Sequence, residues 1–289
     1  MYQISNQQLT VVISAQGAEL QSIYHKKNAL EYMWSGDPAF WGKKSPVLFP
    51  IVGGLKNNSY RFQGNSYSLA RHGFAREREF KMSHQTADCI RFSMVSDKKT
   101  KAVYPFDFIF SIEYSLKQNE LFVKYNVENT GDTNMYFSVG AHPAFKVPLV
   151  EGTTYEDYYL LFDKHETAGI YPLSPEGLIK KNSEPLIVNS NVVPLTKSMF
   201  YKDALVFKQL QSGSIAIVSN KCAHGLKLNY SNFPFMGIWA AKDADFVCIE
   251  PWCGIADGVD ADGDLMVKEG INELSPNILF ERTWSVEVF

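Results

Sequence analysis

The chain has 289 residues, of which 45% are hydrophobic and 14% aromatic, and its formal net charge at pH 7 is -3. This length supports a large core, and the composition excludes both a disordered chain and a basic nucleic-acid-binding surface. We therefore expect a single domain over residues 1–289 whose partner is a small neutral molecule.

The N-terminus and the cysteines indicate the cellular setting. No apolar run approaches the roughly 20 residues of a membrane helix, and the first residues contain no basic segment followed by an apolar one. We expect a cytoplasmic chain that does not bind a membrane. The four cysteines, at 89, 222, 248 and 253, match no zinc spacing and are too few for a disulfide framework, so we expect reduced thiols.

Alternating polar and apolar residues predict strands from the start of the chain. Residues 7–34 alternate in segments that are broken at Gly17 and at the turn 26–28, which indicates paired antiparallel strands. Residues 41–70 contain prolines and a glycine pair, followed by a turn signal at 63–65 between two short runs. We expect a loop and then a hairpin.

Longer amphipathic strands follow. Residues 80–96 and 106–131 each predict strands joined by polar turns, and the second pair turns at 117–120. Every second residue from 106 to 114 is aromatic or aliphatic, so this face should pack on a second sheet. Residues 134–149 predict another apolar strand, which ends at a glycine before His142.

The second half of the chain is less regular at first. Residues 151–200 are polar and weakly periodic, so we expect a long connection with short strands. Strands are then predicted at 204–210, 214–219, 225–230 and 235–241, and a final strand at 278–289. No helical pattern exceeds about three turns, and no repeat is present. The expected fold class is all-β, as a large antiparallel β-sandwich.

One carboxylate, Glu250, stands out in residues 245–258 because it lies between an apolar run and Pro251. Proline cannot donate to a ladder, so the strand should end there and leave Glu250 at its end, close to the core. A carboxylate in that position needs a hydrogen-bonded partner or a raised pKa, and both describe a general base. The alternative is a strand-end glutamate that points into water.

Two of the six histidines, His72 and His142, lie in constrained settings. Each is at a strand-to-loop transition beside Gly, Ala or Pro, which let a ligand approach closely and hold the backbone still. Taken singly, each is more often a packed or solvated histidine than a catalyst. No HxH or HExxH spacing supplies further ligands, so we expect no metal.

The remaining motifs exclude several chemistries. Three aspartates alternate within 260–264, but Leu265 and Ile271 stand where a calcium loop has glycine and glutamate, so we expect a solvated turn. No GxSxG, Walker loop or helix-opening GxGxxG is present. Tryptophans are numerous enough for a sugar-stacking platform, although large aromatics in a sandwich are mostly core; they include Trp34, Trp41, Trp239 and Trp252.

Four segments, taken in order, resemble the aldose 1-epimerase (galactose mutarotase) family in its LacX-like branch. They are LFPIVGGL at 48–55, RHGFAR at 71–76, GAHPAFKVP at 140–148 and FVCIEPWCGIADG at 246–258. The resemblance spans nearly the whole chain. It implies a galactose mutarotase-like β-sandwich and an isomerase that interconverts the α and β anomers of a sugar without a cofactor.

The resemblance also implies roles for three residues. Glu250 matches the family's base, which takes the proton of the anomeric hydroxyl. His142 matches the acid that protonates the ring oxygen, after which the ring opens, the C1–C2 bond rotates and the ring recloses. His72 matches a second histidine that binds near the ring oxygen. The pKa of an imidazole lies near neutrality, so proton transfer is accessible in both directions.

Residues that bind the sugar are matched less directly. Asp203 is the best match to the family's hydroxyl-binding aspartate, ahead of Asp243 and Asp245. Trp252 is expected to contact the sugar beside Glu250.

The substrate stays open because the family has an arginine early in the chain, where this sequence offers only Lys43 and Lys44. Arg71 or Arg76 is expected to take its place. The related hexose-6-phosphate branch carries an HGFAR-like motif and holds phosphate with arginines, so Arg71, Arg76 and Lys44 allow a phosphorylated hexose as the alternative substrate. A non-catalytic sugar-binding protein on the same fold is the third possibility. We expect a monomer or a homodimer.

Overall fold

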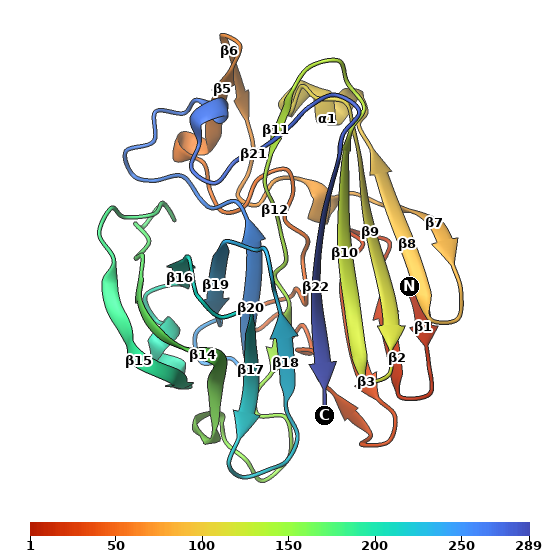
Figure 1. The fold of residues 1–289 in the computed structure, drawn as a ribbon, viewed down its shortest axis with the longest axis vertical. Coiled ribbons are helices and arrows are strands. Elements are labelled where there is room, and N and C mark those ends of the chain that lie inside the picture. The colour runs from red at the N-terminus through yellow and green to blue at the C-terminus, as the bar shows by residue number, and fades with distance from the viewer.

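The largest element of the protein is a nine-stranded antiparallel sheet. The computed structural model describes residues 1–289, and the sheet forms a broad wall through it (Figure 1). Its strands, in spatial order, are β15 (Glu184–Pro194), β14 (Tyr158–Ile170), β17 (Ser214–Ser219), β18 (Leu226–Asn229), β22 (Leu279–Val288), β10 (Glu120–Asn129), β9 (Phe108–Lys117), β8 (Cys89–Val95) and β7 (Lys81–Gln85). This arrangement confirms the all-β, antiparallel fold class.

Strand β9 shows why this sheet forms a core. Its alternate residues are buried, and it pairs with β10 through the predicted turn, from Lys117 opposite Glu120 onward. Phe110 stacks on Phe49 with ring centroids 4.5 Å apart, and the hydroxyl of Tyr114 donates to the carbonyl of Ala18 at 2.6 Å. The face predicted at 106–114 is therefore apolar and buried, as expected, and the contacts at Phe49 and Ala18 come from segments between strands.

A five-stranded sheet occupies the centre of the molecule. Its main path is β12 (Val139–Gly140), β20 (Phe246–Cys253), β19 (Phe235–Trp239) and β16 (Leu205–Lys208), and β13 (Ala144–Lys146) also pairs with β20. Figure 1 shows β20 running through the middle, between β19 and β12. Every residue of β20 is buried, so any polar side chain on it lies in the interior.

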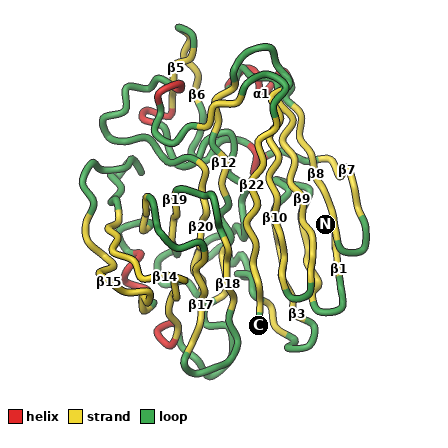
Figure 2. The backbone as a smooth tube through the Cα atoms, viewed as in Figure 1, coloured by secondary structure: helices red, strands yellow, loops and turns green.

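The N-terminal strands, one hairpin and one pair of strands that are distant in the sequence complete the fold. The breaks predicted at Gly17 and 26–28 and the hairpin predicted at 63–65 are confirmed. The hairpin forms a projection at the top of Figures 1 and 2. These strands are β1 (Tyr2–Ser5), β2 (Leu9–Ile13), β3 (Leu20–His25) and β4 (Leu30–Glu31) in one sheet, β5 (Ser59–Phe62) with β6 (Asn65–Ser68), and β11 (Met135–Phe137) with β21 (Asn272–Leu274).

Helical structure is confined to short segments between strands (Figure 2). The α-helix α1 (Lys98–Val103) is capped at its N-terminus by Asp97, whose carboxylate accepts from the Thr100 N–H at 2.7 Å while the Thr100 hydroxyl accepts from the Asp97 N–H. None of the helices has the length and apolarity needed to span a bilayer. The 3₁₀ turns are η1 (Lys56–Asn58), η2 (Ala75–Glu77), η3 (Tyr155–Asp157), η4 (Lys197–Phe200) and η5 (Leu265–Val267).

The prediction for residues 151–200 was wrong, because two of the longest strands, β14 and β15, lie there. Register shifts between Leu161 and Gly169 interrupt the alternation along β14. Strand β15 is an edge strand that is exposed on most of its length, so its residues show no polar and apolar faces. Both effects removed the period-two signal that predicts strands.

The expectation that a strand ends at Pro251 was also wrong, since β20 continues to Cys253. The carbonyl of Pro251 accepts from the Ala141 N–H at 3.1 Å, so its ring nitrogen faces the same neighbouring segment. That segment is interrupted: the predicted strand at 134–149 is split into β11, β12 and β13, and residues 141–143 form a gap in the ladder. The gap removes the need for a donor at Pro251.

The acidic loop after β20 is anchored by a buried ion pair. Lys268 Nζ lies 2.8 Å from Asp257 Oδ1, with both side chains less than 5% exposed, and it also donates to the carbonyl of Ile255 at 2.6 Å. Asp257 accepts from the Lys56 N–H at 2.9 Å, which joins this loop to the 3₁₀ turn that precedes β5. Burial lowers the pKa of Lys268, and Asp257 opposes that change.

Replacement of Lys268 by alanine should therefore destabilise the protein by about 3 to 5 kcal/mol, because it leaves the carboxylate of Asp257 buried without a partner. The measurement is the free energy of unfolding in urea. Lys181→Ala is the matched control, because its ion pair with Asp260 at 2.9 Å is more than 60% exposed on both sides and should contribute less than about 1 kcal/mol. Equal effects of the two substitutions would contradict the prediction.

Candidate active site

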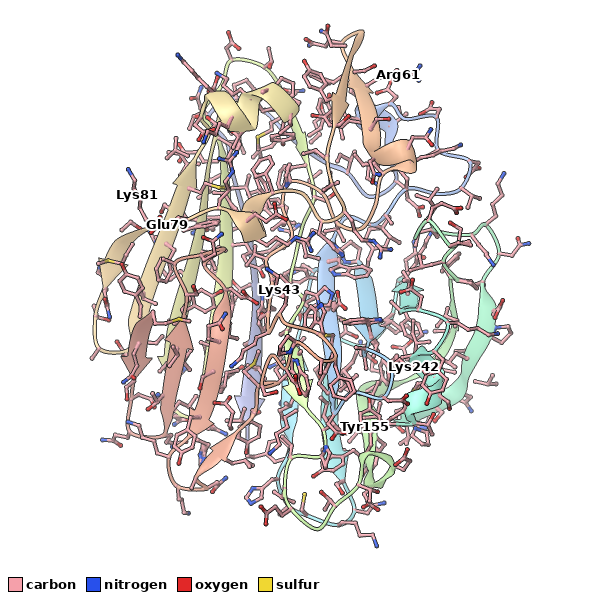
Figure 3. The ribbon with its side chains drawn as sticks, turned by 180° about the vertical axis from the view of Figure 1, so that it is seen from behind. Lys43, Arg61, Glu79, Lys81, Tyr155 and Lys242 are labelled. Atoms are coloured by element: carbon pink, nitrogen blue, oxygen red, sulfur yellow. The ribbon has the colours of Figure 1, made fainter.

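A cavity of about 510 Å³ opens beside the centre of β20. Seven of the eight residues that the sequence analysis selected line it: Arg71, His72, Arg76, His142, Asp203, Glu250 and Trp252. The eighth, Lys44, is not part of the lining, because its Nζ donates to the carbonyl of Gln21 at 3.1 Å and its N–H donates to Glu19. Lys43 is exposed and lies over the middle of the face seen in Figure 3.

Backbone hydrogen bonds from residues 48–54 bring the four sequence motifs together. Leu48 exchanges two hydrogen bonds of 3.0 Å with Gly140, beside the histidine-bearing gap. The carbonyl of Gly53 accepts from the His72 N–H at 2.8 Å, and the carbonyl of Gly54 accepts from the Asp257 N–H at 2.9 Å. Segments far apart in the sequence therefore meet around one short loop.

Glu250 lies in the interior of β20, with 2% of its side chain exposed. Cys248, Glu250 and Trp252 occupy alternate positions, so their side chains share one face of the strand. The carboxyl of Glu250 contacts His142, with Oε1 3.4 Å from Nε2, and lies near the Trp252 N–H. Burial raises the pKa of Glu250 well above its usual value; the nearby Trp252 N–H and the charge of Arg71 lower it in part, and Asp203 raises it further.

His142 lies in the gap between β12 and β13, directly across from Glu250. Its Nε2 is 3.4 Å from Glu250 Oε1. The ring stacks on Trp41 with centroids 5.0 Å apart and meets the edge of Trp239 at 5.7 Å, so it is held on two sides. Burial lowers the pKa of His142 to about 3, and Arg76 and Arg71 act in the same direction. Burial therefore favours the uncharged form of both groups.

His72 has a fixed orientation and tautomer. Its Nδ1 accepts from the Gly53 N–H at 3.1 Å, so the neutral ring carries its proton on Nε2. The ring lies 5.8 Å from that of His142, edge to face. Burial lowers the pKa of His72 well below its usual value, and His142, Arg76 and Arg71 add to this effect. His72 is therefore a neutral donor beside the Glu250 and His142 pair.

The backbone at two cavity residues is in an unusual conformation. His72 has φ of 69° and Asp203 has φ of 145°, in regions that side-chain-bearing residues rarely occupy. Such conformations cost about 1 to 3 kcal/mol each and are concentrated at binding sites. After His72, Gly73 is required because a Cβ there would overlap the carbonyl of Phe49.

The cavity wall carries two arginines without strong acidic partners. Arg71 forms no salt bridge, and its guanidinium lies against Gly177, where any Cβ would overlap it. Arg76 donates to the carbonyl of Arg71 at 2.9 Å and is 3.8 Å from the exposed Glu77. Both guanidinium groups are therefore available to a ligand.

Of the three candidate aspartates, Asp203 lines the cavity and the other two are engaged elsewhere. Asp203 Oδ1 accepts from the Ala204 N–H at 2.7 Å and leaves its second oxygen free of protein partners. Asp243 accepts from the hydroxyl of Tyr201, and Asp245 pairs with Lys197 at 2.7 Å. Lys242, next to Asp243, is exposed and is labelled in Figure 3.

Sequence reasoning missed the loop 173–179, which closes one side of the cavity. Leu173, Gly177 and Ile179 line it. Its contribution comes from backbone shape, because Gly177 supports Arg71 without offering a reactive group. No residue type in this loop signals such a role. Cys248 was also missed as a neighbour of Glu250, although the alternation along β20 could have indicated it.

Comparisons with known proteins agree with this fold. A family model described as aldose 1-epimerase matches residues 1–261. The chromosomal protein LacX of Lactococcus lactis subsp. lactis is 32% identical over 296 residues, which cover 99% of this chain and 98% of that protein.

Two solved structures are similar along the whole chain. The X-ray structure of a galactose mutarotase related enzyme from Lactobacillus acidophilus is 37% identical with a TM-score of 0.95, over 100% of this chain and 97% of that one. A galactose mutarotase-like protein from Lactobacillus casei ATCC 334 is 28% identical with a TM-score of 0.94, over 100% of both chains.

The raised pKa of Glu250 predicts a pH-dependent effect of Glu250→Gln on stability. A carboxyl whose pKa is raised on folding stabilises the fold fully below its unfolded pKa and loses that contribution as pH rises through the folded value. The glutamine variant has no such loss. Its melting temperature relative to the wild type should therefore increase from pH 4.5 to pH 8, by about 2 to 4 °C for each kcal/mol.

Scanning calorimetry at several pH values measures this difference. The exposed Glu151→Gln is the control and should keep a constant difference from the wild type. A constant difference for Glu250→Gln as well would contradict the raised pKa.

Proposed function

The chain belongs to the aldose 1-epimerase family, and we propose on this premise that it interconverts the α and β anomers of a hexose. The observation that carries the proposal is the pair formed by Glu250 and His142, 3.4 Å apart and buried at the wall of a cavity of about 510 Å³. Cavities of this size accommodate small molecules. A carboxyl and an imidazole are sufficient for the reaction, which needs one base and one acid.

The proposed mechanism removes one proton from the sugar and delivers another to it. Glu250 as carboxylate takes the proton of the anomeric hydroxyl while His142 as imidazolium protonates the ring oxygen, so the C1 to ring-oxygen bond breaks and an aldehyde forms. Rotation about C1–C2 and attack by the hydroxyl on the other face give the second anomer, and the protons return. The pair carries one proton before and after, so no net charge is created in the cavity.

The surroundings support this use of the pair. In the free site burial favours the neutral carboxyl of Glu250, but the Trp252 N–H and Arg71 favour its carboxylate form. Hydrogen bonds from bound hydroxyl groups would add to that preference, because bonding to the charged form lowers a carboxyl pKa. His72, a neutral donor through Nε2, is suited to hold the ring oxygen, and Asp203 to accept from sugar hydroxyls.

A phosphorylated hexose is a second candidate substrate. The observation that favours it is the presence of Arg71 and Arg76 in the cavity without strong acidic partners. Guanidinium groups bind phosphate through paired hydrogen bonds. Lys44 does not contribute to this argument, because its ammonium is engaged with Gln21 outside the cavity. A non-catalytic sugar-binding protein is less well supported, because binding alone does not require a buried acid and base pair.

The first test is the effect of Glu250→Gln on anomer exchange. The variant should slow exchange by about 10²-fold or more, because a lost proton-transfer group costs this much, while sugar affinity is largely kept. The rate is followed by the optical rotation of freshly dissolved α-D-glucose and α-D-galactose, and affinity by calorimetry. An unchanged rate in a folded variant, or no acceleration by the wild type with any sugar, would refute the enzyme.

The second test separates the two substrates. Arg71→Met should reduce kcat/KM for glucose 6-phosphate at least about tenfold more than for glucose if the phosphate binds the guanidinium, since a charge-assisted hydrogen bond contributes about 1.5 to 3 kcal/mol. Exchange is measured by NMR with both sugars. Lys44→Met is the control and should affect both equally. An equal loss on both sugars in Arg71→Met would leave the free hexose as substrate.

A further inference from the structure

Three metal-ligating groups of different chemistry meet below the cavity. One ring nitrogen of His142, the Sγ of Cys248 and one carboxyl oxygen of Glu250 all lie within 4.8 Å of one another. Cys248 and Glu250 share a face of β20, and His142 enters from the gap between β12 and β13. His142 is distant in the sequence from Cys248 and Glu250, which explains why spacing alone gave no indication of a metal.

The distances suit a zinc ion. Zinc binds imidazole nitrogen, thiolate and carboxylate at about 2.0 to 2.3 Å, so neighbouring ligand atoms in a tetrahedral site lie about 3.3 to 3.6 Å apart. His142 Nε2 and Glu250 Oε1 are already 3.4 Å apart. The sulfur would have to approach by at most about 1.5 Å, which side-chain rotation on a fixed strand can supply.

The deprotonated ligands would balance the charge of the ion, which offsets the burial that raises the pKa of Cys248 well above its usual value. His142 Nε2 and Glu250 Oε1 contact each other at 3.4 Å, and Nδ1 of His142 is buried without a hydrogen-bond partner. A thiolate, a carboxylate and a neutral imidazole cancel the charge of a divalent cation, so a neutral unit would be buried. Arg71 and Arg76 repel a cation at this place, which favours reversible binding over permanent binding.

We propose that His142, Cys248 and Glu250 form a binding site for Zn²⁺ or a chemically similar thiophilic divalent cation. The fourth position of the ion would face the cavity, where a water molecule completes the tetrahedron. A bound ion occupies both members of the proton-transfer pair. The prediction that the bound ion inhibits anomer exchange rests on the proposed function, whereas the prediction that the ion binds does not.

The test compares two buried cysteines of β20. Cys253 is the matched control, because it lies on the opposite face and its Sγ donates to the carbonyl of Asn232 at 3.6 Å. Cd²⁺ is titrated into the wild type, Cys248→Ser and Cys253→Ser, and the ultraviolet thiolate-to-cadmium absorption band is recorded. The band should appear in the wild type and in Cys253→Ser and be lost in Cys248→Ser. Cys248→Ala serves if the serine variant does not fold.

Exchange kinetics supply an independent measurement. Zn²⁺ should inhibit the wild type competitively with sugar and reversibly by EDTA, and loss of Cys248 should weaken inhibition by about 10-fold or more, since even indirect perturbation of metal sites costs about 10 to 100-fold in affinity. Each variant is compared with its own rate in EDTA. A cadmium band that persists without Cys248, or equal zinc sensitivity of both variants, would overturn the site. A cadmium band dependent on Cys248 in a protein without exchange activity would uphold the site and refute only the function.

Discussion

The burial of one ionisable carboxyl inside a central strand is the constraint around which the structure is arranged. Glu250 sits in β20, all of whose residues are buried, and desolvation opposes its charge. A strand of this kind normally carries only apolar residues, because each buried charge lacks water. The fold tolerates it by opening the adjacent ladder at residues 141–143, so that an imidazole, rather than a backbone, faces the carboxyl. The same gap accommodates Pro251.

Strain elsewhere in the site depends on the rigidity of the surrounding layers. The unusual backbone conformations of His72 and Asp203 persist only if packing determines them. At His72 the determining contacts are visible: both its N–H and its Nδ1 bond to Gly53, and Gly73 lies too close to Phe49 for any side chain. Phe49 is itself in the main core, stacked on Phe110 of the nine-stranded sheet. The orientation of His72 in the site therefore depends on a packing contact in the core.

Most of the fold was predictable from the sequence because a strand with one buried face shows alternating apolar and polar residues, as in residues 106–131. The prediction failed on the edge strand β15, where most residues on both faces are exposed. It also failed along β14, where register shifts interrupt the alternation of buried and exposed residues. It also failed at Pro251, because a proline in a central strand depends on an interruption in a different segment. The grouping of seven of the eight selected residues came from the family resemblance. Lys44 shows the limit of the family resemblance, since nearness in sequence to a matched motif does not bring a side chain into the cavity.

The arrangement of Glu250 and His142 explains how one site can be suited both to proton transfer and to binding an inhibitory metal ion. Two groups whose pKa values are pushed apart by burial share a single proton, so moving it between them through a bound sugar requires no change in the net charge of the cavity. That property requires an imidazole and a carboxyl to face each other without other partners. A thiophilic cation requires the same condition, and Cys248 adds the third ligand because alternation along β20 fixes its direction. Hydrogen bonds that satisfied Glu250 and His142 would exclude the ion, but they would also hold the proton and remove the exchange that the pair is suited to perform.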